Sequence, residues 1–190
     1  MLLLVSSAAS DVYKRQTRHN IGFKIIDAIN LHFKLSKQKP KFKGLLTTGN
    51  IEEKKIYAIK PLTFMNNSGT AIKELIDYFK IDAKDVIVFH DDMDIDFGKI
   101  KAKFGGSSAG HNGIESIDKF IGKEYSRVRI GIGHPKQKKK VNNHVLEDFK
   151  EDEEEKIKEI TENIVKQIPT LIDKKMDLFS SKVNQNLNGI

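Results

Sequence analysis

An apolar run that ends abruptly in acidic residues narrows the choice of fold for this chain. Residues 86–89 read Val-Ile-Val-Phe, without a polar interruption and rich in β-branched side chains. Such a run predicts a strand that is buried on both faces, as in the sheets of α/β proteins. His90, Asp91 and Asp92 follow at once, with Asp94 close behind. Because open α/β sheets place their sites beyond the ends of their strands, we expect Asp91 to point into a pocket.

The other apolar patterns predict strands and helices mixed along the whole chain. Helical spacing predicts helices at 21–34, 70–79, 114–121 and 151–171, with a kink or an end at Pro169. Period-two and apolar runs predict strands at 1–5, 44–50, 55–60, 99–104 and 126–132, the last with basic side chains on one face. No linker divides the 190 residues, so we expect one α/β domain, with 180–190 as a frayed tail.

Charge and cysteine content narrow the possible partners and sites. Lysine and arginine number 33 against 26 acidic residues, a net charge of +7, which makes a polyanion the natural first partner. The absence of cysteine excludes disulfides and thiolate metal sites. No apolar run approaches the roughly 20 residues of a membrane-spanning helix. Composition therefore indicates a basic globular protein.

Three interpretations of the cluster His90–Asp94 compete on residue chemistry alone: a divalent-metal site, an acid/base pair, or a solvated turn. His19, beside a predicted helix start, is a cap or surface residue unless it meets an aspartate that fixes its tautomer. Asn66 and Asn112 lie in loops, where asparagine serves turns but also acts as a neutral donor to an oxyanion. The loop 105–113 is glycine-rich but matches no P-loop.

Five segments, taken together, carry a family resemblance that none of them carries alone. They read Thr-Arg-His-Asn-Ile-Gly (17–22), Lys-Pro-Leu-Thr-Phe-Met-Asn-Asn-Ser-Gly (60–69), His-Asp-Asp-Met-Asp (90–94), Gly-Gly-Ser-Ser-Ala-Gly-His-Asn-Gly (105–113) and Arg-Val-Arg-Ile-Gly-Ile-Gly-His-Pro (127–135). In order and separation they resemble bacterial peptidyl-tRNA hydrolase from residue 17 to about 180. The resemblance implies a single domain with a twisted, mostly parallel mixed sheet flanked by helices. It also implies hydrolysis of the ester between a peptide and the 3′ end of tRNA, which recycles tRNA from stalled translation.

The resemblance assigns roles to residues of the matching segments. His19 corresponds to the general base that activates water, and Asp91 to the residue that orients and polarises it. Asn66 and Asn112 correspond to the groups that position the water, the peptide backbone and the oxyanion. The remaining substrate-side residues that the resemblance implies are Phe64, Met65 and His111.

The resemblance also implies the partner and the setting. Lys101, Lys103 and Arg129 match basic positions that face the phosphates of the tRNA acceptor stem, and such contacts bind without reading sequence. Neither a metal nor another cofactor is implied, which argues against the metal interpretation of Asp91 and Asp92. A monomer in the cytoplasm, with no membrane partner, is expected.

The stretch 6–16 departs from the family pattern. The family carries Gly-x-Gly-Asn-Pro-Gly after the first strand, followed by a tyrosine, whereas this chain reads Ser-Ser-Ala-Ala-Ser-Asp-Val-Tyr-Lys-Arg-Gln. Counted back from His19 without gaps, the family's catalytic asparagine falls on Ala9 and its tyrosine on Lys14. The stretch resembles translated adapter sequence, and we hypothesise that it is an artefact of sequencing or assembly.

Two further function classes remain open on the sequence. One is a relative of the same fold that binds RNA without cleaving it, as a plant organelle splicing factor does, and loss of His19 or Asp91 would favour it. The other is a metal-dependent phosphoesterase, which a chelator would inactivate. Both His19 and Asp91 are present in this chain.

Overall fold

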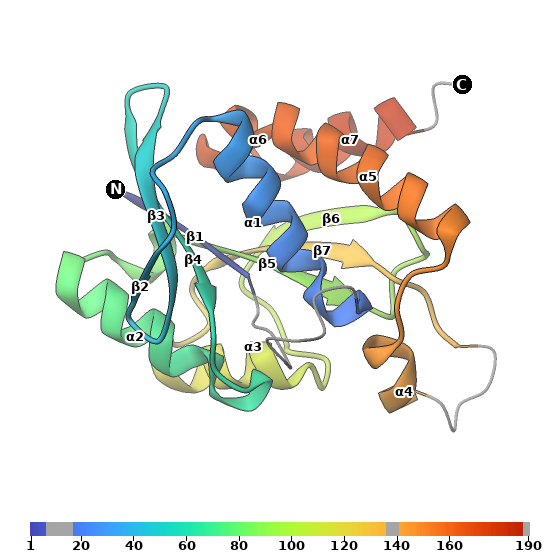
Figure 1. The fold of residues 1–190 in the computed structure, drawn as a ribbon, viewed down its shortest axis with the longest axis horizontal. Coiled ribbons are helices and arrows are strands. Elements are labelled where there is room, and N and C mark those ends of the chain that lie inside the picture. The colour runs from blue at the N-terminus through green and yellow to red at the C-terminus, as the bar shows by residue number, and fades with distance from the viewer. Residues whose placement is uncertain (7–16, 136–140, 188–190) are drawn as a thin grey trace.

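The computed structural model describes residues 1–6, 17–135 and 141–187, and in them one seven-stranded sheet carries helices on both faces (Figure 1). The strand order is β2-β3-β4-β1-β5-β7-β6. The strands are β1 (Leu2–Ser6), β2 (Lys39–Lys41), β3 (Gly44–Ile51), β4 (Lys54–Pro61), β5 (Val86–Asp92), β6 (Ile100–Phe104) and β7 (Ser126–Gly131). The expected single α/β domain with a mixed sheet is confirmed.

The four central strands run parallel, and the pairs at the two edges are antiparallel. β1 pairs in parallel with β4 on one side and with β5 on the other, and β5 pairs in parallel with β7. The chain passes from β1 to β4 and then crosses to β5, so the strand order reverses at β1. Ligand sites of open α/β sheets lie beyond the strand ends at such a reversal.

The helices cover the two faces of the sheet in separate groups. They are α1 (Ile21–His32), α2 (Ser68–Phe79), α3 (Asn112–Ile121), α4 (Val141–Leu146), α5 (Glu151–Lys166), α6 (Ile168–Ile172) and α7 (Met176–Leu187), with short 3-10 turns η1 (Arg18–Asn20), η2 (Met65–Asn67) and η3 (Ala83–Asp85). One core joins the sheet to α1, α5, α6 and α7, and a second core joins it to α2 and α3. None of the helices in the described ranges is long and apolar enough to cross a membrane.

Alternation along the central strands explains their uninterrupted apolar runs. In β5, Ile87 and Phe89 enter the core beneath α1, whereas Val86 and Val88 enter the core above α2 and α3. Both faces are therefore buried, as the run 86–89 predicts. The strand also continues through Asp92, and residues 90–92 are all buried. The interpretation of this cluster as a solvated turn is wrong for residues 90–92, which belong to the strand itself, but it holds for the end of the cluster, where Met93 and Asp94 form a turn and Asp94 is exposed.

The C-terminal part of the chain differs from its prediction in two places. The predicted helix 151–171 is interrupted at Gln167, and Pro169 lies in the first turn of α6, where its missing N–H costs no hydrogen bond. The predicted frayed tail is wrong for residues 180–187, which belong to α7. Phe179 and Val183 of α7 are fully buried and anchor the helix to the core.

Polar side chains of α7 also cover the outer edge of β6. The Asn184 side chain accepts a hydrogen bond from Ile100 N at 2.9 Å and donates one to Ile100 O at 2.8 Å. The Ser180 hydroxyl accepts one from Ala102 N at 2.8 Å. At the other edge of the sheet lies β2, three exposed residues with the sequence Lys-Pro-Lys.

Candidate active site

The turn η1 carries His19 to the carboxyl ends of the central strands and is held there by the residue before it. Arg18 is only 3% exposed, and its guanidinium donates to Asp148 O at 3.0 Å and to the Glu153 carboxylate at 2.6 Å. A cation at the start of a helix opposes the helix dipole unless it is paired, and here the acidic first turn of α5 supplies the pair. Arg18 thereby fixes the position of the adjacent His19.

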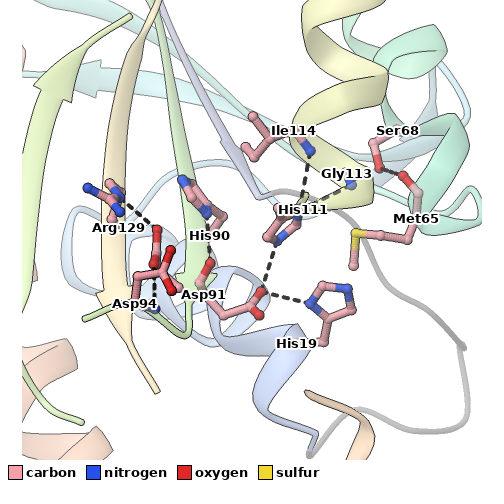
Figure 2. A network of polar contacts seen from close by, with 11 residues as sticks. His19, Met65, Ser68, His90, Asp91, Asp94, His111, Gly113, Ile114 and Arg129 are labelled. Carbon is pink, nitrogen blue, oxygen red and sulfur yellow. Dashed lines mark hydrogen bonds and ion pairs between the residues drawn. The ribbon is translucent and has the colours of Figure 1, made fainter. Parts of the chain in front are cut away.

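The alternation in β5 directs Asp91 toward His19. Asp91 follows the parity of Ile87 and Phe89, so it emerges on the face covered by α1, the helix that begins just after His19. His19 Nδ1 lies 2.8 Å from Asp91 Oδ1 (Figure 2). Because a carboxylate accepts, Nδ1 carries the proton, and the lone pair of Nε2 is left for another partner. The sequence-predicted pair is confirmed as a contact.

His111 approaches the same carboxylate from the start of α3. Its Nε2 lies 3.1 Å from Asp91 Oδ1, and its Nδ1 lies 3.1 Å from Gly113 N and 3.3 Å from Ile114 N. Figure 2 shows both imidazoles directed at one carboxylate oxygen. The two histidine rings are tilted, with centroids 4.9 Å apart. Asp91 is therefore a shared acceptor rather than the partner of His19 alone.

Burial and charge shift the pKa values of His19, Asp91 and His90, and the direction of the shift differs among them. Burial acts to lower the pKa of His19, but the charge of Asp91 and the hydrogen bond to it outweigh burial and raise that pKa. Burial acts to raise the pKa of Asp91, but its interactions with His19 and His111 hold that pKa well below its usual range. Burial lowers the pKa of His90 to about 3, so His90 is neutral at physiological pH. Asp91 is therefore ionised, and His19 binds a proton more readily than a free histidine.

A small cavity of about 120 Å³ opens beside these groups. It is lined by His19, Asp91, Asp92, Met93, Asp94, Ser108, Ala109, Gly110, His111, Asn112 and Val145. The structure thus brings four predicted site residues together: His19, Asp91, His111 and Asn112. A larger hollow of about 870 Å³ lies between α1 and α5, but its walls are mainly apolar and it contains no such acid/base pair. We place the chemistry in the smaller cavity.

Three predicted residues at the η2 turn, Phe64, Met65 and Asn66, are not part of the described wall of this cavity. Met65 is buried, and its carbonyl accepts a hydrogen bond from the Ser68 hydroxyl at 2.7 Å. Asn66 is exposed, and Phe64 is 78% exposed. Figure 2 shows the Met65 side chain directed toward the two imidazoles. Of the three, Met65 is the one that the structure brings to the histidines.

The predicted basic residues share one face of the sheet. Lys101 is opposite Arg129 in the antiparallel register, and Lys103 is opposite Arg127. Arg129 is not an isolated cation, because its Nε donates to Asp92 Oδ2 at 2.7 Å. Burial, followed by the charges of Arg129 and Arg127, lowers the pKa of Lys103. This mutual repulsion of cations is the electrostatic state that a bound anion would relieve.

Arg127 has a role that sequence reasoning missed. It lies on the same face of β7 as Arg129, as the alternation predicts, but it is only 1% exposed. Its guanidinium donates to the carbonyls of Ser107 and Gly106, and it thereby holds the glycine-rich loop from below. The sequence carries no local signal of this role, because the register that sets Lys103 opposite Arg127, below the loop after Phe104, is known only from the structure.

His19, Asp91 and His111 each offer one atom that could bind a metal ion, and these three atoms lie within 4.8 Å of one another. Their hydrogen bonds account for the spacing without one. Each imidazole turns its protonated nitrogen toward the carboxylate, whereas a metal requires the lone pair of that nitrogen. The described side chains therefore fit a hydrogen-bonded acid/base group better than a metal site.

Comparisons with known proteins agree with these features. A family model described as peptidyl-tRNA hydrolase matches residues 9–189. The chain is 70% identical over 184 residues to the peptidyl-tRNA hydrolase of Pelagibacter ubique (strain HTCC1062), covering 97% of this chain and 99% of that protein. It is 44% identical to that of Ehrlichia ruminantium (strain Welgevonden), covering 88% and 86%. A crystal structure of peptidyl-tRNA hydrolase from Acinetobacter baumannii superposes with a TM-score of 0.87 at 30% identity, covering 97% and 94%.

Proposed function

This chain belongs to the peptidyl-tRNA hydrolase family, and from that premise we propose that it cleaves the ester between a peptide and the 3′ end of tRNA, which recycles tRNA from stalled translation. The observation that carries the assignment to this site is the His19 Nδ1 to Asp91 Oδ1 contact of 2.8 Å at the small cavity. It leaves Nε2 of His19 with a lone pair, which is what a general base requires.

The proposed reaction is a direct attack of water on the ester carbonyl. His19 Nε2 takes one proton from the water as its oxygen bonds to the carbonyl carbon, and Asp91 stabilises the imidazolium that forms. The tetrahedral intermediate then expels the 3′ oxygen of the tRNA, which receives the proton from His19. The products are a peptide acid and a free tRNA 3′ hydroxyl. An ester is a better substrate than an amide for this route, because its leaving oxygen needs less assistance.

We assign the oxyanion and the substrate to neutral donors around the pair. Asn112, at the start of α3, lies in the wall of the cavity and is suitably placed to donate to a developing oxyanion. Asn66, on the η2 turn, is proposed to reach the substrate once it is bound. Phe64, at 78% exposure, offers an apolar surface for the peptide. Neutral amides suit this work because they leave the proton affinity of His19 unchanged.

We propose that the acceptor stem lies along the basic face formed by Lys101, Lys103 and Arg129. Phosphate contacts of lysine and arginine provide affinity without base recognition, which suits an enzyme that accepts many tRNAs. The register that sets Lys101 opposite Arg129 and Lys103 opposite Arg127 gathers cations on this face and supports an anion here. A monomer acting in the cytoplasm completes the proposal.

Release of a blocked aminoacyl group from tRNA, measured in the presence of a metal chelator, tests this function directly. We expect hydrolysis to continue at the same rate when the chelator is added, because the proposed base acts on water without a Lewis acid. Loss of activity on chelation, restored by a divalent cation, would instead support the phosphoesterase alternative. Binding of tRNA with no hydrolysis at any pH would support the non-catalytic RNA-binding alternative.

Removing two cations of the basic face is expected to weaken tRNA binding selectively. In the double variant Lys103→Gln and Arg129→Gln, the slope of log K against log salt should flatten by about 0.9 for each phosphate that the protein no longer neutralises. Cleavage of a small ester substrate should remain close to that of the wild type. The measurement is the tRNA dissociation constant across a salt series.

A matched control separates this local effect from net charge. The double variant Lys158→Gln and Lys166→Gln removes the same charge from exposed positions of α5, and it should leave the salt slope unchanged. The proposal would be contradicted if the Lys103 and Arg129 variant hydrolysed peptidyl-tRNA and the small ester with equally reduced rates. That result would mean that these residues support the active site itself.

A further inference from the structure

We propose that His111 is a positioning residue: the start of α3 locks it as the neutral Nε2–H tautomer, and in that form it shares the Asp91 carboxylate with His19 and limits the negative charge that His19 meets. The inference rests on the proposed function, because it concerns the same general base. It assigns to His111 a task other than lining the cleft.

The tautomer follows from the partners of Nδ1. Gly113 N and Ile114 N both point at His111 Nδ1, at 3.1 and 3.3 Å. Backbone N–H groups can only donate, so Nδ1 must hold a lone pair and no proton. His111 precedes the first residue of α3 and accepts from the free amides of its first turn, as a capping side chain does. The proton of the neutral ring is therefore on Nε2.

Nε2 directs that proton at the catalytic carboxylate. It lies 3.1 Å from Asp91 Oδ1, the same oxygen that His19 Nδ1 contacts at 2.8 Å. When two N–H groups donate to one carboxylate oxygen, each stabilises part of the negative charge on that oxygen. Each hydrogen bond is therefore weaker than it would be alone. His111 therefore weakens the pull of Asp91 on the His19 proton while it holds the carboxylate in place.

The contacts of His111 leave no place for a proton on Nδ1. A second proton on Nδ1 would break both amide contacts and add positive charge at the positive end of the ten-residue helix α3. His90 packs edge-on against His111 with ring centroids 5.1 Å apart, and it is itself neutral. Three carboxylates lie on the neighbouring elements: Asp92 accepts from Arg129 at 2.7 Å, Asp94 contacts His134 at 2.9 Å, and Glu115 in the first turn of α3 accepts from the Ser108 hydroxyl at 3.3 Å.

This arrangement affects the pH range in which His19 is unprotonated and can act as a general base. A general base acts only in its unprotonated form, and the Asp91 charge alone would keep His19 protonated to a higher pH. A neutral donor on the same oxygen reduces the rise that Asp91 causes in the pKa of His19. A larger fraction of His19 is then unprotonated near neutral pH.

The variant His111→Asn separates the two interactions of this side chain. An asparagine at this position caps α3 well, because its carbonyl oxygen accepts from the same two amides, but it is too short to donate to Asp91. His111→Ala can neither cap the helix nor donate to the carboxylate. We expect His111→Asn to melt close to the wild type and His111→Ala to melt lower.

The decisive readout is the acid limb of kcat/KM against pH. In His111→Asn this limb should move to higher pH by roughly 0.5 to 1 unit, about half of the shift that one hydrogen bond to a charged group can cause, because the bond acts on His19 only through Asp91. The rate at pH 6 should consequently fall more than the rate on the alkaline plateau. An unmoved limb, or one displaced to lower pH, would overturn the proposal.

Nitrogen-15 NMR of the histidine side chains provides a test that does not depend on activity. In the wild type at pH 8, His111 should show the Nε2–H tautomer, and the pKa of His19 should rise in His111→Asn. A proton on His111 Nδ1, or an unchanged His19 pKa, would disprove the inference. If hydrolysis itself failed, these spectra would still decide the role of His111, so the two failures are distinguishable.

Discussion

Replacement of His19 by alanine is expected to lower peptidyl-tRNA hydrolysis by roughly 10²-fold or more, the usual contribution of a positioned general base. The fold should persist, because Asp91 keeps the hydrogen bond from His111 Nε2 at 3.1 Å and Arg18 still anchors η1 to the first turn of α5. Binding of tRNA should persist as well, since the basic face is untouched. The measurement is kcat/KM with a blocked aminoacyl-tRNA, alongside tRNA affinity and melting temperature.

A substitution of His32 and the pH dependence of kcat/KM serve as controls. His32 is exposed at the end of α1, away from the cavity, and His32→Ala should retain wild-type turnover. In the wild type, kcat/KM should increase with pH through a midpoint above the ordinary histidine value of about 6.5, because Asp91 raises the pKa of His19 and protonated His19 is inactive. Near-normal turnover in His19→Ala would refute the proposed mechanism.

Rebuilding the stretch after β1 is expected to raise the rate by roughly 10²–10³, which corresponds to about 2.7–4 kcal/mol for one positioned polar group. The repaired chain carries Gly-Leu-Gly-Asn-Pro-Gly at positions 6–11 and Tyr in place of Lys14. Ala9 stands where the family has its catalytic asparagine and provides no amide to hold the substrate. Residues 7–16 lie outside the described ranges, so this prediction depends on the sequence comparison and on the one described residue of the stretch.

That residue, Ser6, supports the choice of glycine at its position. Its side chain is fully buried, and its hydroxyl has no hydrogen-bond partner among the residues that the structure describes. A β-carbon added to Gly22 would lie only 3.0 Å from that of Ser6, so β1 and α1 approach each other closely here.

The chain as written should fold and bind tRNA but hydrolyse it slowly. Written and repaired chains are compared side by side in ester hydrolysis, with Ala9→Asn alone as the control that isolates the amide. Equal rates for the written and repaired chains would show that this turn has no catalytic role here. Independent sequencing of the source locus that returned residues 6–16 unchanged would remove the artefact hypothesis but not the rate prediction.

The parts of the fold that sequence predicts are those with periodic apolar patterns. The helix beginning at Ile21 and the strand beginning at Val86 are both present, because each buries a continuous apolar face. The C-terminal helix escapes prediction because only Phe179 and Val183 are fully buried on its inner side, while Met176 and Leu187 pack against the core only partly buried. Its other attachments, through Ser180 and Asn184, depend on an edge strand nearly 80 residues earlier, as the separations of 78 and 84 positions show. No local pattern reports such a partner.

In the active site too, sequence indicates some of the residues, whereas the contacts between them are known only from the structure. Polar residues at the end of a buried strand identify Asp91, but the partner of Asp91 depends on which face of β5 it occupies and on which helix covers that face. The family resemblance supplies His19, whereas the tautomer of His111 depends on amides that only a structure positions. The alternation of Arg127 with Val128 predicts basic side chains on one face of the strand, but it gives no sign of the loop that covers Arg127.

The cover that α7 places on β6 has a consequence for the behaviour of the protein in a crowded solution. A bare outer strand is a template on which a second molecule can add its own strand, and this is how sheet proteins begin to aggregate. Here the peptide groups of Ile100 and Ala102 are already bonded to Asn184 and Ser180. The opposite edge, β2, is short, charged and interrupted by Pro40, which makes it a poor template. The last helix therefore acts as a guard against intermolecular strand pairing, and a shortened chain without it would become prone to aggregation even with its catalytic groups intact.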